Sequence, residues 1–110
     1  MSNLYRVAIS AGAERDLGDI HRWIADDRGD EAADAFLGDV IDRIETLARF
    51  PLRGPVPREI AGLGMDMFRQ STMGRYRLIY RVDPGVATIL MIADGRRDLQ
   101  SLLEARLLGR

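Results

Sequence analysis

Apolar side chains recur along the first fifty residues in patterns that predict one strand and two helices. Residues 4–10, LYRVAIS, alternate between apolar and polar positions, which is typical of a short strand. From Ala11 to about Arg28, apolar residues at steps of three or four mark one narrow stripe on an otherwise charged helix. The residues of this stripe are Ala13, Leu17, Ile20 and Ile24. Ser10 directly precedes the helix and has the side chain of an N-cap.

A second helix is predicted over Glu31–Phe50, with a wider apolar stripe. Its apolar residues are Ala33, Phe36, Leu37, Val40, Ile41, Ile44, Leu47 and Ala48. They span about half of the helical circumference, which suits a helix that packs both on a partner helix and on a sheet. Gly29 is expected to end the first helix, Asp30 to cap the second and Pro51 to terminate it. The two helices are therefore expected to form a hairpin.

The rest of the chain is predicted to contain a loop, three strands and a helix. Residues 51–64, PLRGPVPREIAGLG, are rich in proline and glycine and are typical of a connecting loop. Short turn sequences separate three strand-like segments, 67–72, 75–82 and 86–93, which predicts an antiparallel meander. The last of these, VATILMIA, is apolar on both faces and is expected at the centre of the sheet. Leucines recur at helical spacing over residues 99–108.

These elements give the order β-α-α-β-β-β-α. The 110 residues fit a single domain, residues 1–110. We expect an α+β fold of two layers, in which the helical hairpin, residues 11–50, covers one face of an antiparallel sheet.

Composition excludes several kinds of chemistry. The absence of cysteine excludes disulfides, thiolate zinc sites and a cysteine nucleophile. All 16 basic residues are arginine, so Schiff-base and P-loop lysines are also excluded. No apolar run reaches the roughly 20 residues of a membrane span, and no secretory leader opens the chain. We therefore expect a cytoplasmic protein with no metal, no cofactor and no membrane contact.

The arginines gather in the second half of the chain. Residues 1–50 contain 6 arginines and 11 acidic residues, whereas residues 51–110 contain 10 arginines and 6 acidic residues. Alternation in the strand 75–82 places one set of side chains toward the core: Tyr76, Leu78, Tyr80 and Val82. Three arginines share the opposite face, and three more extend the basic patch: Arg75, Arg77 and Arg81, with Arg69, Arg96 and Arg97. Such a face is either solvated sheet surface or a surface that binds phosphates or an acidic partner peptide.

The sequence resembles the RelE/ParE superfamily of small bacterial toxins from type II toxin–antitoxin systems. The resemblance is carried by an ordered set of segments from Tyr5 to Leu108: YRV, DLGDIHRWIA, RIETLARFPLRGP, GRYRLIYRV and ILMIADGRRD. It implies the same β-α-α-β-β-β-α order. It also implies an antitoxin partner whose C-terminal segment wraps the toxin in a hetero-oligomer.

Two branches of this superfamily differ in activity. The RelE branch cleaves messenger RNA on the ribosome, and Arg69 and Arg97 fall at basic positions of its catalytic pattern. Leu103 stands where that pattern has a tyrosine, and the chain has no lysine for the other roles. The segments PREIAGLGMDMFRQSTMGRYRLIYRV and DGRRD are more similar to the ParE branch, which inhibits DNA gyrase and is neutralised by a ParD-like antitoxin.

Independent of the resemblance, the residues offer little for proton transfer. RNA cleavage by the ribose 2′-OH needs a proton acceptor and a proton donor, and arginine supplies only charge. His21, the single histidine, lies at the edge of the first helix's stripe and is interpreted as structural or solvated. Asp94 or Asp98 can in principle act as a base beside Arg96 and Arg97.

Three functions remain open. The preferred one is a ParE-like toxin that binds gyrase. The alternatives are a RelE-like ribosome-dependent ribonuclease, with Arg69 and Arg97 as catalytic residues, and an inactive toxin fold that only binds an antitoxin. The expected target- or antitoxin-binding residues are Arg69, Arg75, Arg77, Arg81, Arg96, Arg97, Leu103 and Leu107. The basic half and the C-terminal leucines together predict an antitoxin peptide rich in acidic and apolar residues.

Overall fold

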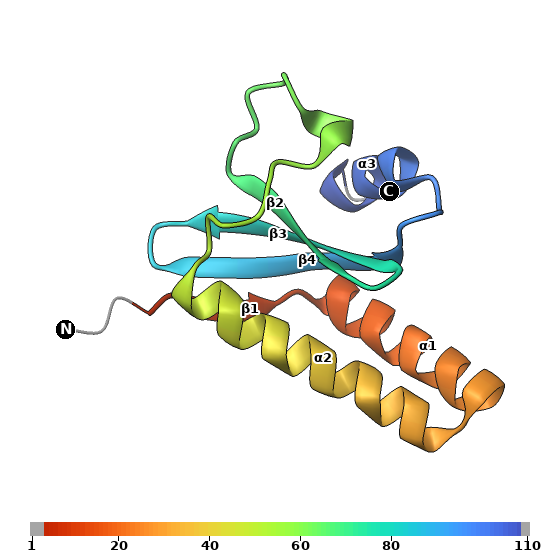
Figure 1. Cartoon of the computed structure of the whole chain (residues 1–110). Coiled ribbons are helices and arrows are strands. Elements are labelled where there is room, and N and C mark those ends of the chain that lie inside the picture. The colour runs from red at the N-terminus through yellow and green to blue at the C-terminus, as the bar shows by residue number, and fades with distance from the viewer. Residues whose placement is uncertain (1–3, 109–110) are drawn as a thin grey trace.

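The computed structural model describes residues 4–108 and contains one mixed sheet with helices on both of its faces (Figure 1). The elements in chain order are β1 (Arg6–Ile9), α1 (Ala11–Arg28), α2 (Asp30–Arg49), a 3-10 turn η1 (Arg58–Ile60), β2 (Phe68–Met73), β3 (Tyr76–Asp83), β4 (Val86–Asp94) and α3 (Leu99–Leu108). The predicted order β-α-α-β-β-β-α and the α+β class are confirmed.

The helical hairpin forms through the expected caps, with one correction. The Ser10 hydroxyl accepts a hydrogen bond from the Ala13 N–H at 3.1 Å, so Ser10 is the N-cap of α1. Gly29, at φ 95°, both ends α1 and precedes α2, so Asp30 is the first residue of α2 and not its cap. None of the helices within residues 4–108 combines the length and apolarity that crossing a membrane requires.

The sheet has the strand order β1-β4-β3-β2. The pairs β2–β3 and β3–β4 are antiparallel, as the predicted meander requires. β1, however, pairs with β4 in parallel, from Arg6 opposite Val86 to Ile9 opposite Ile89, so the sheet is not antiparallel throughout. The reason is that the α1–α2 hairpin and the following loop lead the chain across the sheet before the meander begins. β4 lies between β1 and β3, in agreement with its two apolar faces.

The main core lies between the sheet and the α1–α2 hairpin, which covers one face (Figure 1). Both helices and the inward faces of β3 and β4 contribute side chains to it. The buried residues of this core are Ala13, Ile24, Ala33, Phe36, Val40, Leu47, Met73, Tyr76, Leu78, Tyr80, Ala87, Ile89 and Ile92. The rings of Phe36 and Tyr76 meet edge to face, with centroids 5.1 Å apart. Ile41, placed in the predicted stripe of α2, is instead exposed.

A second, smaller core lies on the opposite face, under α3 and the segment around η1 (Figure 1). Its buried residues are Ile60, Phe68, Ile79, Met91, Ala93, Leu99 and Leu103. The expectation that helices cover only one face is therefore wrong. The physical reason is that β3 and β4 also present Ile79, Met91 and Ala93 to this face, and these side chains need a cover.

A β-bulge in β4 ties the start of α1 and the end of α3 to the sheet. Ile79 pairs with Met91 and Tyr80 with Ile89, so Leu90 is the extra residue. The freed Leu90 carbonyl accepts hydrogen bonds from the Ser10 hydroxyl and from Arg106 of α3. Arg106 also forms a two-pronged ion pair with Asp16 of α1, with both N–O distances at 3.0 Å.

Candidate functional site

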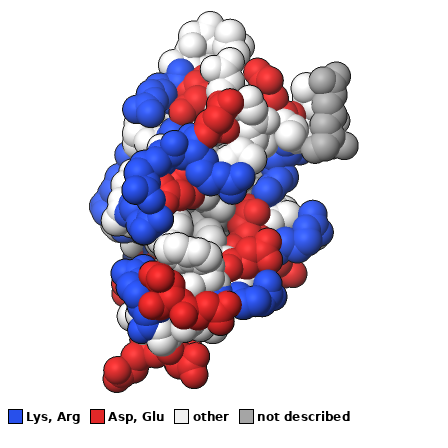
Figure 2. Space-filling view, turned by 90° about the vertical axis from the view of Figure 1, so that its right-hand side faces the viewer, with Lys and Arg blue, Asp and Glu red and all other residues white. Residues whose placement is uncertain are grey.

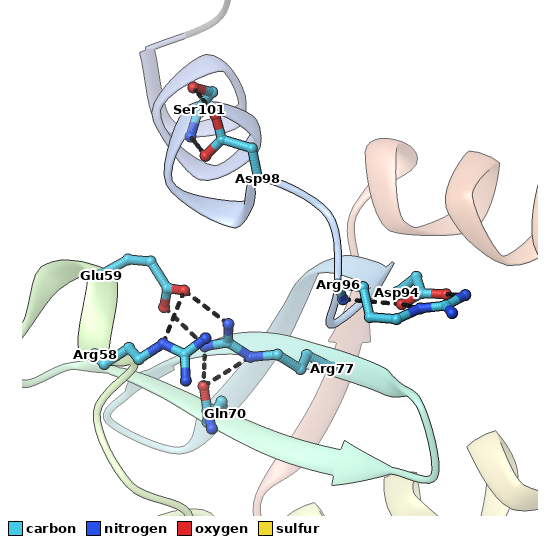
Figure 3. Close-up of polar contacts among 8 residues, drawn as sticks. All are labelled: Arg58, Glu59, Gln70, Arg77, Asp94, Arg96, Asp98 and Ser101. Carbon is cyan, nitrogen blue, oxygen red and sulfur yellow. Dashed lines mark hydrogen bonds and ion pairs between the residues drawn. The ribbon is translucent and has the colours of Figure 1, made fainter.

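Arg77 of β3 belongs to the predicted arginine patch, but its side chain is almost buried. Its guanidinium donates to both carboxylate oxygens of Glu59 at 2.8 Å and to the side-chain oxygen of Gln70 (Figure 3). The Arg77 side chain is 10% exposed and that of Glu59 is 12% exposed. Hydrogen bonding to Arg77 lowers the pKa of Glu59 against the opposing effect of burial. Arg77 therefore fixes η1 onto the sheet.

Asp94, at the end of β4, gathers two further arginines of the patch. Its carboxylate accepts from the side chain and backbone N–H of Arg96, and from Arg75 at 2.7–2.8 Å (Figure 3 shows the Arg96 contacts). Hydrogen bonds from Arg96, and then from Arg75, hold the pKa of Asp94 far below its ordinary value. The same contact raises the pKa of Arg96. This carboxylate is thus held ionised.

The remaining arginines of the predicted patch lie apart from one another. Arg81 pairs with Asp83 at 3.0 Å, at the end of β3 opposite to Arg75. Arg69 donates to the carbonyls of Leu52, Gly54 and Asp66 at 3.0–3.3 Å and so closes the loop before β2. Arg97 is exposed and, within residues 4–108, has no carboxylate in ion-pair contact. The structure therefore brings Arg75, Arg96 and Arg97 together and separates the others.

The two leucines of the predicted site differ in exposure. Leu103 is 2% exposed and belongs to the second core. Leu107 lines an apolar groove of about 230 Å³ between α3 and the segment that contains η1. The other apolar residues of this groove are Ile60, Leu63, Met65, Leu103 and Leu108. Leu63 and Leu108 are 66% and 63% exposed, so the groove has open apolar rims.

Three groups that can carry protons, Asp98, His21 and Tyr80, are engaged in structural contacts. The Asp98 side chain accepts from the N–H and the hydroxyl of Ser101, which lowers its pKa and caps α3 (Figure 3). His21 contacts Asp34 of α2 at 3.3 Å, in the helical hairpin and away from the arginines. The Tyr80 hydroxyl donates to the Pro51 carbonyl at 2.7 Å, and burial raises its pKa. Among the described residues, none of these groups offers a free general acid or base beside the arginines.

A pocket that the sequence did not predict opens between α1 and the end of the sheet. It has a volume of about 420 Å³, and its lining includes Ile20, Trp23, Arg75, Tyr76 and Arg97. Trp23 is 49% exposed, and the Arg75 guanidinium lies over its ring at 5.4 Å from the centroid. Figure 2 shows this side of the molecule, where charged side chains of both signs surround an uncharged hollow. The sequence does contain one indication of this pocket, because Trp23 lies outside the apolar stripe of α1.

The sequence was compared with models of known protein families. The family model described as the ParE toxin of the type II toxin–antitoxin system parDE matches residues 7–99. The chain belongs to the ParE toxin family. This confirms the predicted superfamily and the preference for its ParE branch.

Solved structures of related toxins agree with the ParE fold. A chain of the chromosomal ParDE toxin–antitoxin system from P. aeruginosa is 22% identical, with a TM-score of 0.69, and the match covers 84% of this chain and 98% of that one. A chain of the RelBE2 toxin–antitoxin complex from Mycobacterium tuberculosis is 28% identical, with a TM-score of 0.57, and 83% and 91% are covered.

The fold is shared across both branches. A mutant of the E. coli toxin RelE in the free state is 14% identical, with a TM-score of 0.55, over 90% of this ParE-family chain and 92% of that one. No curated protein matches the sequence. The common fold therefore leaves the activity to be decided by the side chains at the site.

Proposed function

We propose that this member of the ParE toxin family inhibits DNA gyrase by binding and is held inactive by a ParD-like antitoxin. Gyrase acts on DNA in the cytoplasm, which is where the proposal places the protein. Both the family match and the side chains around the arginines support this proposal. Toxin and antitoxin would form a hetero-oligomer, and the toxin would need no cofactor.

The observation that carries the proposal is the occupation of every carboxylate beside the arginines. Glu59 is bound by Arg77, Asp94 by Arg75 and Arg96, and Asp98 by Ser101. A base must be free to take a proton, and hydrogen bonds that stabilise the ionised form weaken a carboxylate as a base. The site is therefore better suited to hold a partner's surface than to move protons in RNA cleavage.

The antitoxin part of the proposal is supported by the apolar groove beside α3. Its open rims, Leu63 and Leu108, are the kind of surface that an apolar segment of a partner covers. Two of the predicted contact residues, Leu103 and Leu107, line this groove. One of the similar structures is a toxin–antitoxin complex, so the fold of the similar chain is compatible with a bound antitoxin.

The test is a direct comparison of the two possible targets. Purified toxin is incubated with gyrase and supercoiled plasmid, and separately with translating ribosomes. We expect gyrase to be inhibited, with intact messages, and the inhibition to be removed by a cognate ParD-like antitoxin. Message cleavage at codon positions with unaffected gyrase would overturn the proposal.

A second function, the RelE-like ribonuclease, is favoured by one observation. Arg97 is exposed and carries no ion pair within the described residues, so it is available to contact a phosphate. In the ribosome assay this function requires cleavage that is lost in Arg97→Ala. If neither assay shows activity while the antitoxin still binds, the chain is an inactive binding module.

A further inference from the structure

The edge of β4 is only partly covered by β1. Pairing between these strands ends at Ile9 opposite Ile89, after which the chain turns into α1. Two side chains then replace a neighbouring strand. Arg106 binds the Leu90 carbonyl, and the Asp16 carboxylate accepts from the Ile92 N–H at 3.0 Å. The first part of the exposed edge is thus closed by the ion pair of Asp16 and Arg106.

The last part of this edge has no neighbouring strand within residues 4–108, although Ile92 itself is only 3% exposed. Gly95 donates to the Arg75 carbonyl at 2.7 Å, so Gly95 and, two residues earlier, Ala93 face β3. The alternate residues, Ile92 and Asp94, therefore face away from β3. The Ile92 carbonyl and the Asp94 N–H point outward from the sheet, and no strand pairs with them in residues 4–108. Such groups are a template for one more short strand.

The pocket beside Trp23 lies against this open edge. Ile20, Ile92 and Ala93 give it an apolar lining, and Trp23 and Tyr76 add aromatic surface. Arg75 is held in place by Asp94 and lies over both rings, at 5.4 and 5.6 Å from their centroids. Tryptophan, tyrosine and arginine are the residue types that dominate binding energy in protein interfaces, particularly when they are held rigidly.

The charges around the pocket favour an acidic occupant. Its three carboxylates already have arginine partners: Asp16 with Arg106, Asp19 with Arg22, and Asp94 with Arg75 and Arg96. Arg97 also lines the pocket, but within residues 4–108 it forms no ion pair. The pocket therefore presents one positive charge without a partner, next to apolar and aromatic surface.

We propose that an extended segment of the antitoxin adds to β4 at this edge as a short strand. Its backbone would bond the Ile92 carbonyl and the Asp94 N–H. An apolar side chain would lie against Trp23, and a carboxylate would bind Arg97. An unfolded antitoxin segment fits better than a folded target because two residues of open edge between α1 and the loop after β4 accept only a narrow chain. The identity of the partner rests on the proposed function.

Trp23 makes the proposal directly measurable because it is the single tryptophan of the chain. Full-length antitoxin, with any tryptophan of its own replaced by phenylalanine, is titrated into the toxin. We expect the Trp23 emission to shift to shorter wavelength as the segment excludes water, and the exchange of the Asp94 amide to slow by about tenfold or more. A complex that forms without either change would overturn the proposal.

A pair of arginine variants provides the matched control. Arg97→Ala should weaken antitoxin binding by about tenfold, the effect of one lost charge-assisted contact. Arg49→Ala removes an exposed arginine at the end of α2, outside the pocket, and should change binding less than twofold. Equal affinities of the two variants would also overturn the proposal. Absence of any complex would overturn the proposed antitoxin partner as well, so the two failures are distinguishable.

Discussion

The two faces of the sheet are covered in different ways. The α1–α2 hairpin covers one face with two long helices, and its core consists almost entirely of apolar side chains. The other face is covered by the ten-residue α3 and a loop, and beside its small apolar core lies the ion pair of Arg77 and Glu59. The first face is held by apolar burial, and the second also depends on the geometry of a charged pair.

The two faces therefore differ in what they contribute: the first mainly stabilises the fold, and the ion pair on the second mainly fixes η1 in position on the sheet. A buried ion pair adds little net stability because both charges lose their hydration, but removal of one partner leaves the other buried without compensation. The face under α3 is therefore expected to contribute less to the free energy of unfolding than the α1–α2 face. It carries the apolar groove and Arg77, whereas the pocket beside Trp23 lies between α1 and the end of the sheet.

The largest expected effect is on the α1–α2 face. Leu78 is fully buried, and Leu78→Ala should lower the free energy of unfolding by about 4 kcal/mol because it leaves a cavity in the main core. Leu103→Ala, in the smaller core under α3, should cost about 2–3 kcal/mol because α3 can move to fill the space. Urea denaturation of both variants measures the difference. A larger loss in Leu103→Ala would contradict the comparison.

The ion pair of Arg77 and Glu59 gives the next largest effect. Arg77→Ala should cost about 3 kcal/mol, since it leaves the Glu59 carboxylate nearly buried without its partner. The double variant Arg77→Met with Glu59→Leu should recover most of this loss because no charge then remains buried. Thermal and urea unfolding measure both. If the double variant is no more stable than Arg77→Ala, the pair itself supplies net stability.

Acid should weaken the same contact. The pKa of Glu59 in the folded protein lies below its ordinary value of 4.5, so its contribution to stability is complete above that pH. It is lost as the pH falls from there through the lower pKa of the folded state. Glu59→Gln should therefore show a flatter dependence of unfolding free energy on pH below 4.5 than the parent protein. Parallel pH profiles for the two proteins would contradict this assignment.

The smallest expected effect concerns the link between α1 and α3. A Cβ at Gly12 would lie 2.8 Å from a guanidinium nitrogen of Arg106, so Gly12→Ala displaces the end of that flexible side chain. Alanine also favours the helix, and the net change in stability should stay within about 1 kcal/mol. Amide exchange in α3 should nevertheless become faster, while exchange in α2 stays constant. Unchanged exchange in α3 would show that Arg106 does not anchor this helix.

The two faces also differ in how far the sequence predicts them. The apolar stripe of α1, the Ser10 cap and the order of elements follow from local spacing, and the structure agrees. The partner of Arg77 does not follow from spacing, because Glu59 lies 18 residues away in a loop. The same holds for Arg106 and Asp16, which are 90 residues apart. Alternation places the arginines of β3 correctly on one face but does not predict which of them are already paired.

The parallel pairing of β1 with β4 has a consequence for the synthesis of the toxin. Arg6 pairs with Val86, so the first strand is made 80 residues before its neighbour. At roughly 5–20 residues per second, a ribosome needs roughly 4–16 seconds to cover that distance. During this interval the α1–α2 hairpin has no complete sheet to cover. The complete toxin fold therefore forms only late in translation. For several seconds each new chain is still incompletely folded, and antitoxin can already be present before the toxin fold is complete.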